Sequence, residues 1–500
     1  MNKLKRTLAL MAALAMATTA FVSCGDDSSS SSSSSSSSTS ESSDESSDES
    51  SDESSESSSG TKSTEVGAID SSLGTGGASF TVAAWNADDI PYLIAQWKGL
   101  DYDDTVAKLA NNEIEGVTFN NLGCQGGDAS EKYDQLFTAN ADIDVYAVEA
   151  DWALKYINDD TKTVALDKLG FTDDNFAEIY SYTDEIGKDS NGVRKGVSWQ
   201  AAAGGFAYRS DLAEEYLGVT SPEEMQAQIS DWDKFVAAAE TVSEKSSGKT
   251  ALADTLGGLW QAYACGRTQP WVVDNKLVID DFCEDFANTA KALWDCGGVT
   301  KNSQWSDEWT AAGTNDSCMG YFVSTWGFGG FFLDASGGAP DEEEGKEAGA
   351  TYGKWAVCEG PQSFFWGGTW LVVNPATDNA EEAQAFIKSA VVDNDQMKAY
   401  ATAKPEYVNN STVMQELVDA NTVMNEKISG NLGGQNYFAA LHENAKQIDF
   451  KGLITEYDAT VKTDFVDAVK TNYLEGGASW DDTKEAFMDL VAEHITGLDW

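Results

Sequence analysis

One stretch rich in small residues, residues 193–218, constrains the fold more than any other part of the chain. It begins with an extended Gly-Val-Ser-Trp run and continues through alanines and glycines at 201–205. It then becomes a helical pattern that ends at Gly218. Small residues let one backbone pass close to another. We interpret the stretch as the crossing of the chain from one lobe to a second; a buried strand followed by an ordinary helix has the same pattern.

The length of 500 residues also predicts two lobes, because one hydrophobic core rarely serves so long a chain. Strand-like apolar runs at 79–85, 117–119 and 144–148 alternate with helical patterns. This alternation predicts an α/β fold with a parallel sheet, whose binding crevice lies beyond the carboxyl ends of the strands. A later helix is predicted to begin after Ser230, whose hydroxyl can cap it.

The charge of the chain is strongly negative, with a formal net charge of −51 at pH 7. Such a surface repels nucleic acid and anionic lipid headgroups, so we expect no nucleic-acid partner. The two histidines, His442 and His494, lie far apart without the spacing of metal ligands, and we expect both at the surface or at helix ends. The sequence therefore predicts no metal site, no cofactor and no Ser-His-Asp machinery.

The N-terminus has the features of an export signal. Residues 1–6 are basic, residues 8–20 form an apolar run too short for a membrane span, and Phe-Val-Ser-Cys at 21–24 resembles a bacterial lipoprotein box. We expect a signal peptide at 1–23 and a lipid such as palmitate on Cys24, which would hold the protein on the extracellular face of the bacterial cell membrane. Plain secretion with cleavage nearby is the alternative.

A linker is expected to follow Cys24. Residues 26–59 contain only Ser, Thr, Asp and Glu, so they have no apolar surface to offset the entropy of ordering, and their charges repel one another. We expect the linker to span 24–77 and to let a folded body stand off the membrane. The six cysteines beyond Cys24 are scattered without a CxxC motif, and both disulfides and free thiols are compatible with their spacing.

Several motifs follow one another in a set order along the chain. They are Gly-Val-Ser-Trp at 196–199, Gly-Gly-Phe-Ala-Tyr-Arg-Ser-Asp-Leu at 204–212, Ser-Asp-Trp-Asp-Lys-Phe at 230–235, the runs 355–361 and 367–375, and Ala-Phe-Ile-Lys at 385–388. Their order and spacing resemble those of family 1 extracellular solute-binding proteins, the sugar-capturing components of ABC importers, and the resemblance covers roughly residues 78–500.

The resemblance implies a two-lobed fold of the periplasmic-binding-protein type, with a hinge and an inter-lobe cleft. Because such chains cross between the lobes three times, we expect lobe I to comprise 78–202 and 373–415, and lobe II to comprise 203–372 and 416–500. The resemblance also implies a monomeric, non-enzymatic protein that passes a carbohydrate to the membrane subunits of an ABC importer.

Tryptophans that follow strands or glycine pairs suggest how a sugar would be held. Aromatic rings stack on the apolar face of a sugar, while carboxylate and amide groups bind its hydroxyls. Gln200 and Glu149 are second candidates, and Trp199 and Trp366 fit either the core or the ligand site. Asp151 can instead cap a helix. The residues expected to bind ligand are Trp85, Asn86, Asp151, Trp152, Trp260, Trp326, Trp370 and Tyr437.

Two other functions are compatible with the sequence. The negative charge favours a cationic solute such as a polyamine, because carboxylates and aromatic rings bind amines well. A glycoside hydrolase would need a pair of carboxylates around the scissile bond. The chain has many acids, but none of them lies in a recognisable catalytic motif, so we expect binding without turnover.

Overall fold

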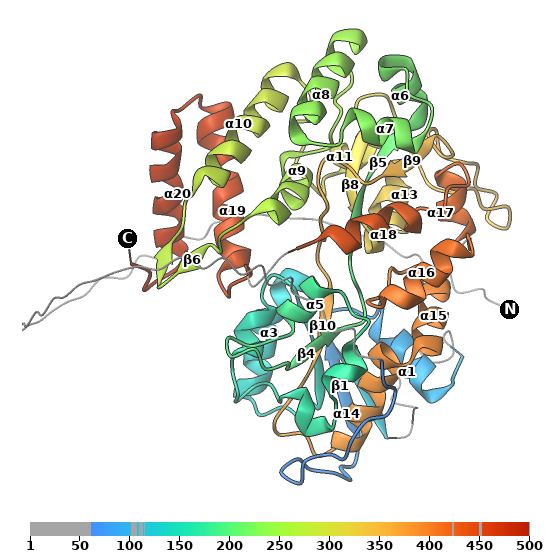
Figure 1. Cartoon of the computed structure of the whole chain (residues 1–500), viewed down its shortest axis with the longest axis vertical. Coiled ribbons are helices and arrows are strands. Elements are labelled where there is room, and N and C mark those ends of the chain that lie inside the picture. The colour runs from blue at the N-terminus through green and yellow to red at the C-terminus, as the bar shows by residue number, and fades with distance from the viewer. Residues whose placement is uncertain are drawn as a thin grey trace, which may run out of the picture. The chain divides into compact units, whose positions relative to one another are not determined.

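Two β-sheets organise the residues that the structure describes, and they mark the two lobes of the fold (Figure 1). The computed structural model describes residues 62–101, 108–109, 114, 116–422, 425–449 and 453–499. All of these lie in the unit that spans residues 61–500. The predicted signal peptide, Cys24 and most of the predicted linker lie outside the described residues.

The first sheet has five strands in the order β2-β1-β3-β10-β4. Strand β1 pairs in parallel with β2 and β3, as predicted, whereas β10 runs antiparallel to both β3 and β4. The sheet is therefore mixed, because β10 returns to it from the second sheet in the opposite direction. Its strands are β2 (Val117–Asn121), β1 (Phe80–Ala84), β3 (Val145–Glu149), β10 (Thr369–Val373) and β4 (Gly196–Ser198).

Helices cover the first sheet through aromatic contacts. The ring of Phe80 lies 5.3 Å from Trp97 of α1 and 5.9 Å from Phe386 of α14. Tyr146 lies 5.3 Å from Tyr133 of α3. The helical segments of this part are α1 (Ile90–Lys98), α3 (Gly126–Thr138), α4 (Ala153–Ile157), η1 (Leu166–Leu169), η2 (Asp173–Phe176), α5 (Ser181–Ile186), α14 (Ala380–Ile387), η4 (Lys388–Val392), α15 (Asn394–Ala403) and α16 (Ser411–Asp419).

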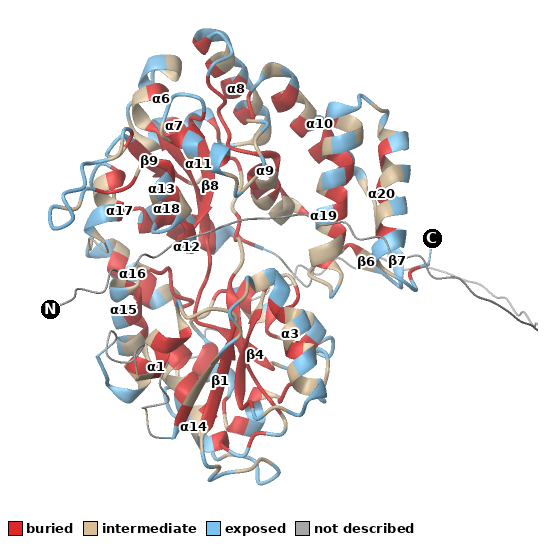
Figure 2. Ribbon diagram, turned by 180° about the vertical axis from the view of Figure 1, so that it is seen from behind, coloured by how far each residue is buried: buried red, intermediate tan, exposed pale blue. Residues whose placement is uncertain are grey.

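The second sheet has three antiparallel strands in the order β8-β5-β9. Buried residues concentrate on the strands of both sheets (Figure 2). The elements of this part are β5 (Gly204–Arg209), β8 (Gly320–Ser324), β9 (Trp355–Cys358), α6 (Ser210–Leu217), α7 (Pro222–Gln228), α8 (Trp232–Ser246), α9 (Leu256–Tyr263), η3 (Ala264–Gly266), α10 (Asp281–Cys296), α11 (Asp307–Gly313), α12 (Thr325–Phe328), α13 (Phe331–Ala335), α17 (Glu426–Asn431) and α18 (Phe438–Gln447).

The predicted crossing at 193–218 is confirmed. Strand β4 ends at Ser198 in the first sheet and β5 begins at Gly204 in the second. A Cβ atom on Gly204 would lie 2.2 Å from the ring of Phe364, so only glycine lets the start of β5 approach that ring this closely. Helix α6 ends at Gly218, whose φ of 74° is left-handed.

Helix α8 begins as the sequence predicts, but with a different cap. The side chain of Asp231 accepts a hydrogen bond from the amide of Lys234 at 2.9 Å. Ser230 instead accepts a hydrogen bond from the ammonium of Lys234 at 2.6 Å. The prediction that Ser230 caps the helix is therefore wrong, because the helix starts one residue later and the carboxylate takes that role.

A helical pair near the C-terminus packs on α10 and α9 (Figure 1). Phe465 of α19 lies 5.7 Å from Phe286 and 5.0 Å from Trp260. Among the described residues, no helix combines the length and apolar character that a membrane crossing requires. These segments are β6 (Val272–Val273), β7 (Lys276–Leu277), α19 (Asp458–Ala468), η5 (Val469–Glu475) and α20 (Trp480–His494).

Residues 62–77 lie along the folded body rather than forming the loose linker predicted there. The amides of Ser63, Gly67 and Asp70 donate to the carbonyls of residues 174, 170 and 168 at 2.7–2.9 Å. Lys62 forms an ion pair with Glu178 at 2.9 Å. Composition alone misses this attachment, because backbone amides form these hydrogen bonds whatever their side chains. We define residues 62–77 as the N-terminal strap.

The histidines and cysteines are placed as follows. His442 is 2% exposed, and its Nδ1 lies 2.6 Å from the hydroxyl of Tyr407, so the prediction of a surface position is wrong for this residue. His494 ends α20 and lies 2.8 Å from Asp464. The six cysteines beyond Cys24 are all free thiols.

Candidate functional site

Four of the eight predicted ligand residues lie at strand ends of the two sheets. Trp85 and Asn86 follow β1, Asp151 follows β3, and Trp326 follows β8. All four are at least partly exposed. Strand order places the ends of β1 and β3 side by side, as the paired register requires. These residues therefore combine an aromatic and a polar surface at the edge where an α/β fold binds its ligands.

Gly367, in the segment that leads from β9 to β10, lies between residues that follow the first sheet and residues that follow the second. Its φ of 72° is left-handed, which favours glycine. A Cβ atom there would lie 3.4 Å from Nε1 of Trp326 and 3.8 Å from Oε1 of Glu149. The glycine thus brings a tryptophan that follows the second sheet close to a carboxyl group of the first.

Three tryptophans form a partly open aromatic surface beside Gly367, which we call the indole wall: Trp305, Trp326 and Trp366. The ring of Trp326 lies 5.1 Å from Trp366 and 6.2 Å from Trp305, and its Nε1 donates to the carbonyl of Trp366 at 2.8 Å. Trp305 is 43% exposed and Trp326 37%. A contiguous exposed apolar patch of this kind marks a candidate binding site.

Trp305 also has an unusual backbone. Its φ of 71° lies in the left-handed region, which a bulky side chain rarely adopts. Strain of this kind persists only where neighbouring contacts hold it, and it gathers at binding and catalytic sites. Trp309 and Phe331 lie 5.0 and 5.4 Å from the Trp305 ring and hold it from one side.

The polar edge of the site is a cluster of Glu149, Asp151 and Lys462. The amide of Asp151 donates to Oε2 of Glu149 at 2.9 Å, and the ammonium of Lys462, from α19, forms an ion pair with Asp151. Burial, followed by the charge of Asp151, raises the pKa of Glu149 to about 8. The carboxyl group of Glu149 is therefore mainly protonated at neutral pH and can both donate and accept hydrogen bonds.

A polar pocket of about 670 Å³ adjoins Trp85 and Asn86. A Cβ atom on Gly126, at the start of α3, would lie 3.7 Å from the Trp85 indole and 3.9 Å from the Glu149 side chain, so the pocket and the polar edge share one border. The remaining lining residues are Ala87, Asn121, Gly123, Cys124, Gln125, Asp128, Glu131, Lys132 and Gln135. Amides and carboxylates of this kind suit a ligand with many hydroxyl groups.

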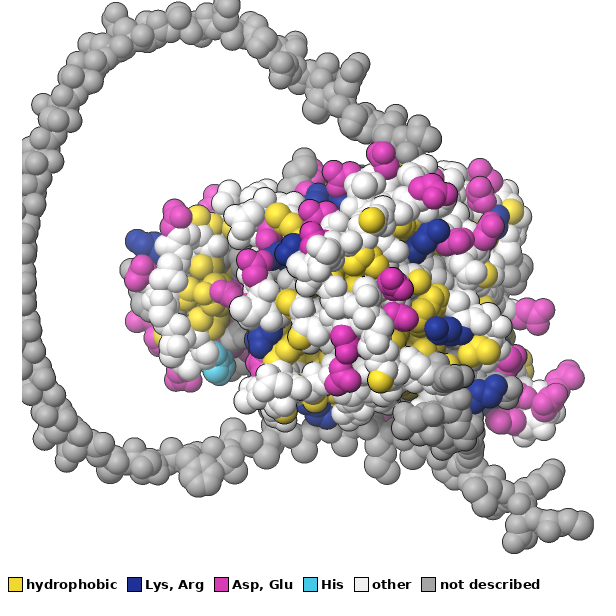
Figure 3. Space-filling view, turned by 90° about the horizontal axis from the view of Figure 1, so that it is seen from below, with side chains coloured by type: hydrophobic (Ala, Val, Ile, Leu, Met, Phe, Trp, Pro, Cys, Tyr) yellow, Lys and Arg dark blue, Asp and Glu magenta, His cyan; other side chains and the backbone are white. Residues whose placement is uncertain are grey.

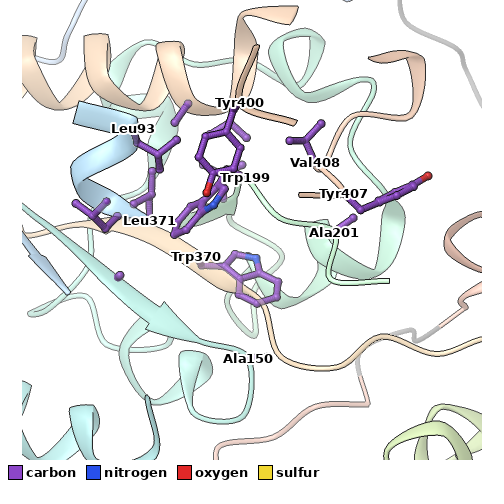
Figure 4. Close-up of a cluster of buried hydrophobic side chains, with 14 of the residues drawn as sticks. Leu93, Ala150, Trp199, Ala201, Trp370, Leu371, Tyr400, Tyr407 and Val408 are labelled. Atoms are coloured by element: carbon purple, nitrogen blue, oxygen red, sulfur yellow. The ribbon is translucent and has the colours of Figure 1, made fainter. Parts of the chain in front are cut away.

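The other four predicted ligand residues are buried. Trp370 is 1% exposed, and its Nε1 donates to the carbonyl of Thr183 at 2.9 Å. Figure 4 places it in the hydrophobic cluster with Trp199 and Tyr400. Tyr437 packs 4.7 Å from the ring of Phe328. The indole of Trp370 therefore serves the core of the first lobe in this structure, because neighbours cover β10 on both faces.

Trp152 and Trp260 lie just behind the candidate site. Trp152 is 5% exposed and stands edge-on to Trp85 at 6.1 Å, so it supports that ring. Trp260 is 3% exposed and packs 4.7 Å from Phe286. Of the second candidates, Gln200 is buried and donates to Glu406 at 3.2 Å, whereas Glu149 belongs to the polar edge.

Sequence reasoning missed Trp305 and Lys462. Trp305 follows no strand and no glycine pair, and the only local signal is a tryptophan between polar residues in a segment too short to bury it. Lys462 lies on α19, 311 residues from Asp151 in the sequence, and no local pattern marks such a pairing. Among the described residues, no group of three or more potential metal ligands gathers.

Comparison with known proteins identifies the family. A model of the bacterial extracellular solute-binding protein family matches residues 104–428. No curated protein matches the chain. Among solved structures, one of an extracellular solute-binding protein of family 1 is 18% identical, with a TM-score of 0.68, and the match covers 83% of this chain and 99% of that one.

Two sugar-binding proteins have the same fold. The MalE protein of Xanthomonas citri is 15% identical, with a TM-score of 0.61 over 83% of this chain and 98% of its own. The galacto-N-biose/lacto-N-biose I-binding protein of Bifidobacterium longum is also 15% identical, with a TM-score of 0.59 over 84% and 98%. The chain has the two-lobed α/β fold of these binding proteins, whose role is to capture a solute rather than to convert it. It belongs to the family of bacterial extracellular solute-binding proteins.

Proposed function

We propose that the chain binds an oligosaccharide in the cleft between its lobes and delivers it to the membrane subunits of an ABC importer. The observation that carries the proposal is the indole wall next to the polar edge. Two exposed indoles offer flat apolar surfaces to sugar rings, and Asn86, Glu149 and Asp151 offer hydrogen-bonding groups to the hydroxyls.

The similar structures support a sugar as the solute. The Bifidobacterium longum protein was solved in complex with lacto-N-biose, and the Xanthomonas citri protein is described as sugar-binding. A third similar structure, from Bifidobacterium animalis subsp. lactis, holds β-1,6-galactobiose. A sugar ring stacked on the indole wall would leave the pocket beside Trp85 free for further sugar units of the same ligand.

Titration of intrinsic tryptophan fluorescence tests the proposal. The full chain is titrated with mono- and oligosaccharides of glucose, galactose, xylose and mannose, in α- and β-linked series. We expect a saturable change with at least one series. The test variant is Trp326→Phe, which should reduce the fluorescence change. Its matched control is Trp294→Phe, a substitution of a buried residue of α10, which should keep the fluorescence change. A folded protein that responds to no sugar refutes the proposal.

We also propose that Cys24 carries a lipid that holds a monomeric protein on the extracellular face of the membrane. The lipoprotein-like box and the preceding apolar run support this assignment. Metabolic labelling with a clickable palmitate analogue should label the wild-type protein but not Cys24→Ser. Equal labelling of the wild-type protein and Cys24→Ser contradicts the anchor.

We also keep the lobe boundaries as a proposal: 78–202 with 373–415 for lobe I, and 203–372 with 416–500 for lobe II.

A further inference from the structure

A chain of opposite charges runs from the first sheet to the C-terminal helices. The ammonium of Lys462 pairs with Asp151, and Arg267 pairs with Asp458 at 2.8 Å. The side chains of Arg267 and Asp458 are 6% and 9% exposed, and that of Lys462 is 22% exposed. Each acid thus has one cation of its own, and the group as a whole is close to neutral.

The position of Lys462 is that of a bound amine. Its ammonium lies among carboxyl groups from two parts of the chain: Asp151 is its ion-pair partner, and Glu149 and Asp458 act on its charge. Trp260, Trp271, Gln261 and Gly367 line the same small cavity of about 60 Å³. Carboxylates and indoles around an ammonium are the elements from which proteins build amine-binding sites.

We propose that Lys462 is the resident cation of the site and that it makes the site select uncharged solutes. This inference rests on the proposed function and narrows it: the solute is a neutral sugar, without an amino group at the polar edge. The crevice of a protein with a net charge of −51 would otherwise concentrate and bind cations.

Two physical effects exclude a cationic solute. An incoming ammonium group would meet the like charge of Lys462 beside Asp151, while the neighbouring carboxyl group of Glu149 is held largely protonated and offers no negative charge to it. It could displace Lys462 only by leaving that ammonium partly buried without a partner, which is strongly unfavourable. Specificity of this type comes from a repulsive group as well as from attractive ones.

The substitution Lys462→Ala should convert the exclusion into binding. It removes three methylene groups and the ammonium, which is the shape of n-propylammonium, and it leaves Asp151 without its cation. The small cavity of about 60 Å³ already present beside Lys462 would be enlarged by the volume of the removed atoms. The vacated space and the uncompensated carboxylate should therefore admit the added amine.

Calorimetric titration with n-propylammonium and putrescine tests the proposal on the full chain. Wild type should show no 1:1 binding up to the highest amine concentration used, and Lys462→Ala should bind at least one amine with a dissociation constant at least about tenfold below that concentration. The double variant Lys462→Ala with Asp151→Asn should lose the gain, and Lys462→Arg should not acquire it. The matched control is Lys291→Ala, which removes an exposed cation paired with Asp295 on α10 and should behave as wild type.

The possible outcomes separate this inference from the proposed function. Putrescine binding 1:1 to wild type, or no gain in a folded Lys462→Ala protein, overturns the resident cation. Should Lys462→Ala fail to fold, the wild-type and Lys462→Arg titrations still decide, because 1:1 amine binding to either refutes the proposal. A gain of amine binding by Lys462→Ala in a protein that binds no sugar supports the resident cation and refutes only the oligosaccharide.

Discussion

The raised pKa of Glu149 makes a prediction about stability. Its carboxyl group has a pKa of about 8 in the folded protein, against an ordinary value of 4.5. Between these two pH values the folded state keeps a proton that the unfolded chain has released. The unfolded state binds fewer protons, so the free energy of unfolding falls as the pH rises through this window. Below pH 4.5 both states are protonated and the stabilisation is complete.

The magnitude follows from the size of the shift. One pKa unit corresponds to about 1.4 kcal/mol, so the difference between 4.5 and about 8 would give about 5 kcal/mol for a fully buried group, and the partial exposure of Glu149 reduces this total to roughly 3 kcal/mol. Glu149→Gln mimics the protonated acid and can still accept from the amide of Asp151. We expect the variant to match wild type near pH 5 and to exceed its free energy of unfolding by roughly 3 kcal/mol near pH 8.5.

Urea unfolding followed by circular dichroism at pH 5, 6, 7, 8 and 8.5 measures the difference. Glu406, buried beside Gln200, also has a pKa of about 8, raised chiefly by burial. The free energy of unfolding of Glu149→Gln therefore still falls with pH in this window, because Glu406 remains, and only the difference from wild type reports on Glu149. The control is Glu214→Gln, an exposed acid on α6, which removes the same charge from the surface. If the difference between Glu149→Gln and wild type is the same at pH 5 and pH 8.5, the reasoning about Glu149 is wrong.

Three further predictions concern the wall, the core and the thiols. Trp326→Ala should weaken sugar binding at least roughly tenfold with little loss of stability, whereas Trp370→Ala should lower the free energy of unfolding by about 3–5 kcal/mol; the reverse pattern in titrations and urea melts would contradict the placement of both. Gly258→Ala should cost about 1–3 kcal/mol in urea unfolding, because its Cβ would lie 2.5 Å from Oδ1 of Asp254, and an unchanged melt would show that the carboxylate moves freely. A thiol reductant should leave the Tm unchanged, since the six cysteines beyond Cys24 are free, and a fall of several degrees would reveal a disulfide.

Much of the fold could be predicted from the sequence because local signals mark it. The small residues at 201–205 predicted the crossing, and Gly218 predicted where α6 ends. The direction of β10 could not be predicted, because pairing depends on where the chain returns from. The attachment of the N-terminal strap depends on backbone groups, to which composition is blind.

The site was predictable only in part, because a tryptophan at a strand end can point either way. Trp85 lines a pocket and Trp326 is exposed, while Trp370 is the second residue of β10, whose residues are all buried. Lys462 could not be predicted, because its partner Asp151 lies 311 residues away in the sequence. The excess of acids, which alone favours a cationic solute, is spread over the surface, as the face in Figure 3 shows.

The N-terminal strap gives the first lobe a mechanical role. Any pull applied on the N-terminal side of Lys62 is borne by the ion pair to Glu178 and then by the hydrogen bonds of Ser63, Gly67 and Asp70, all of which end on the segment 168–178. The load therefore stops before it reaches the crossing at 199–203. If the protein is held by that end, the tension acts on the first lobe alone, and the second lobe can still move relative to the first.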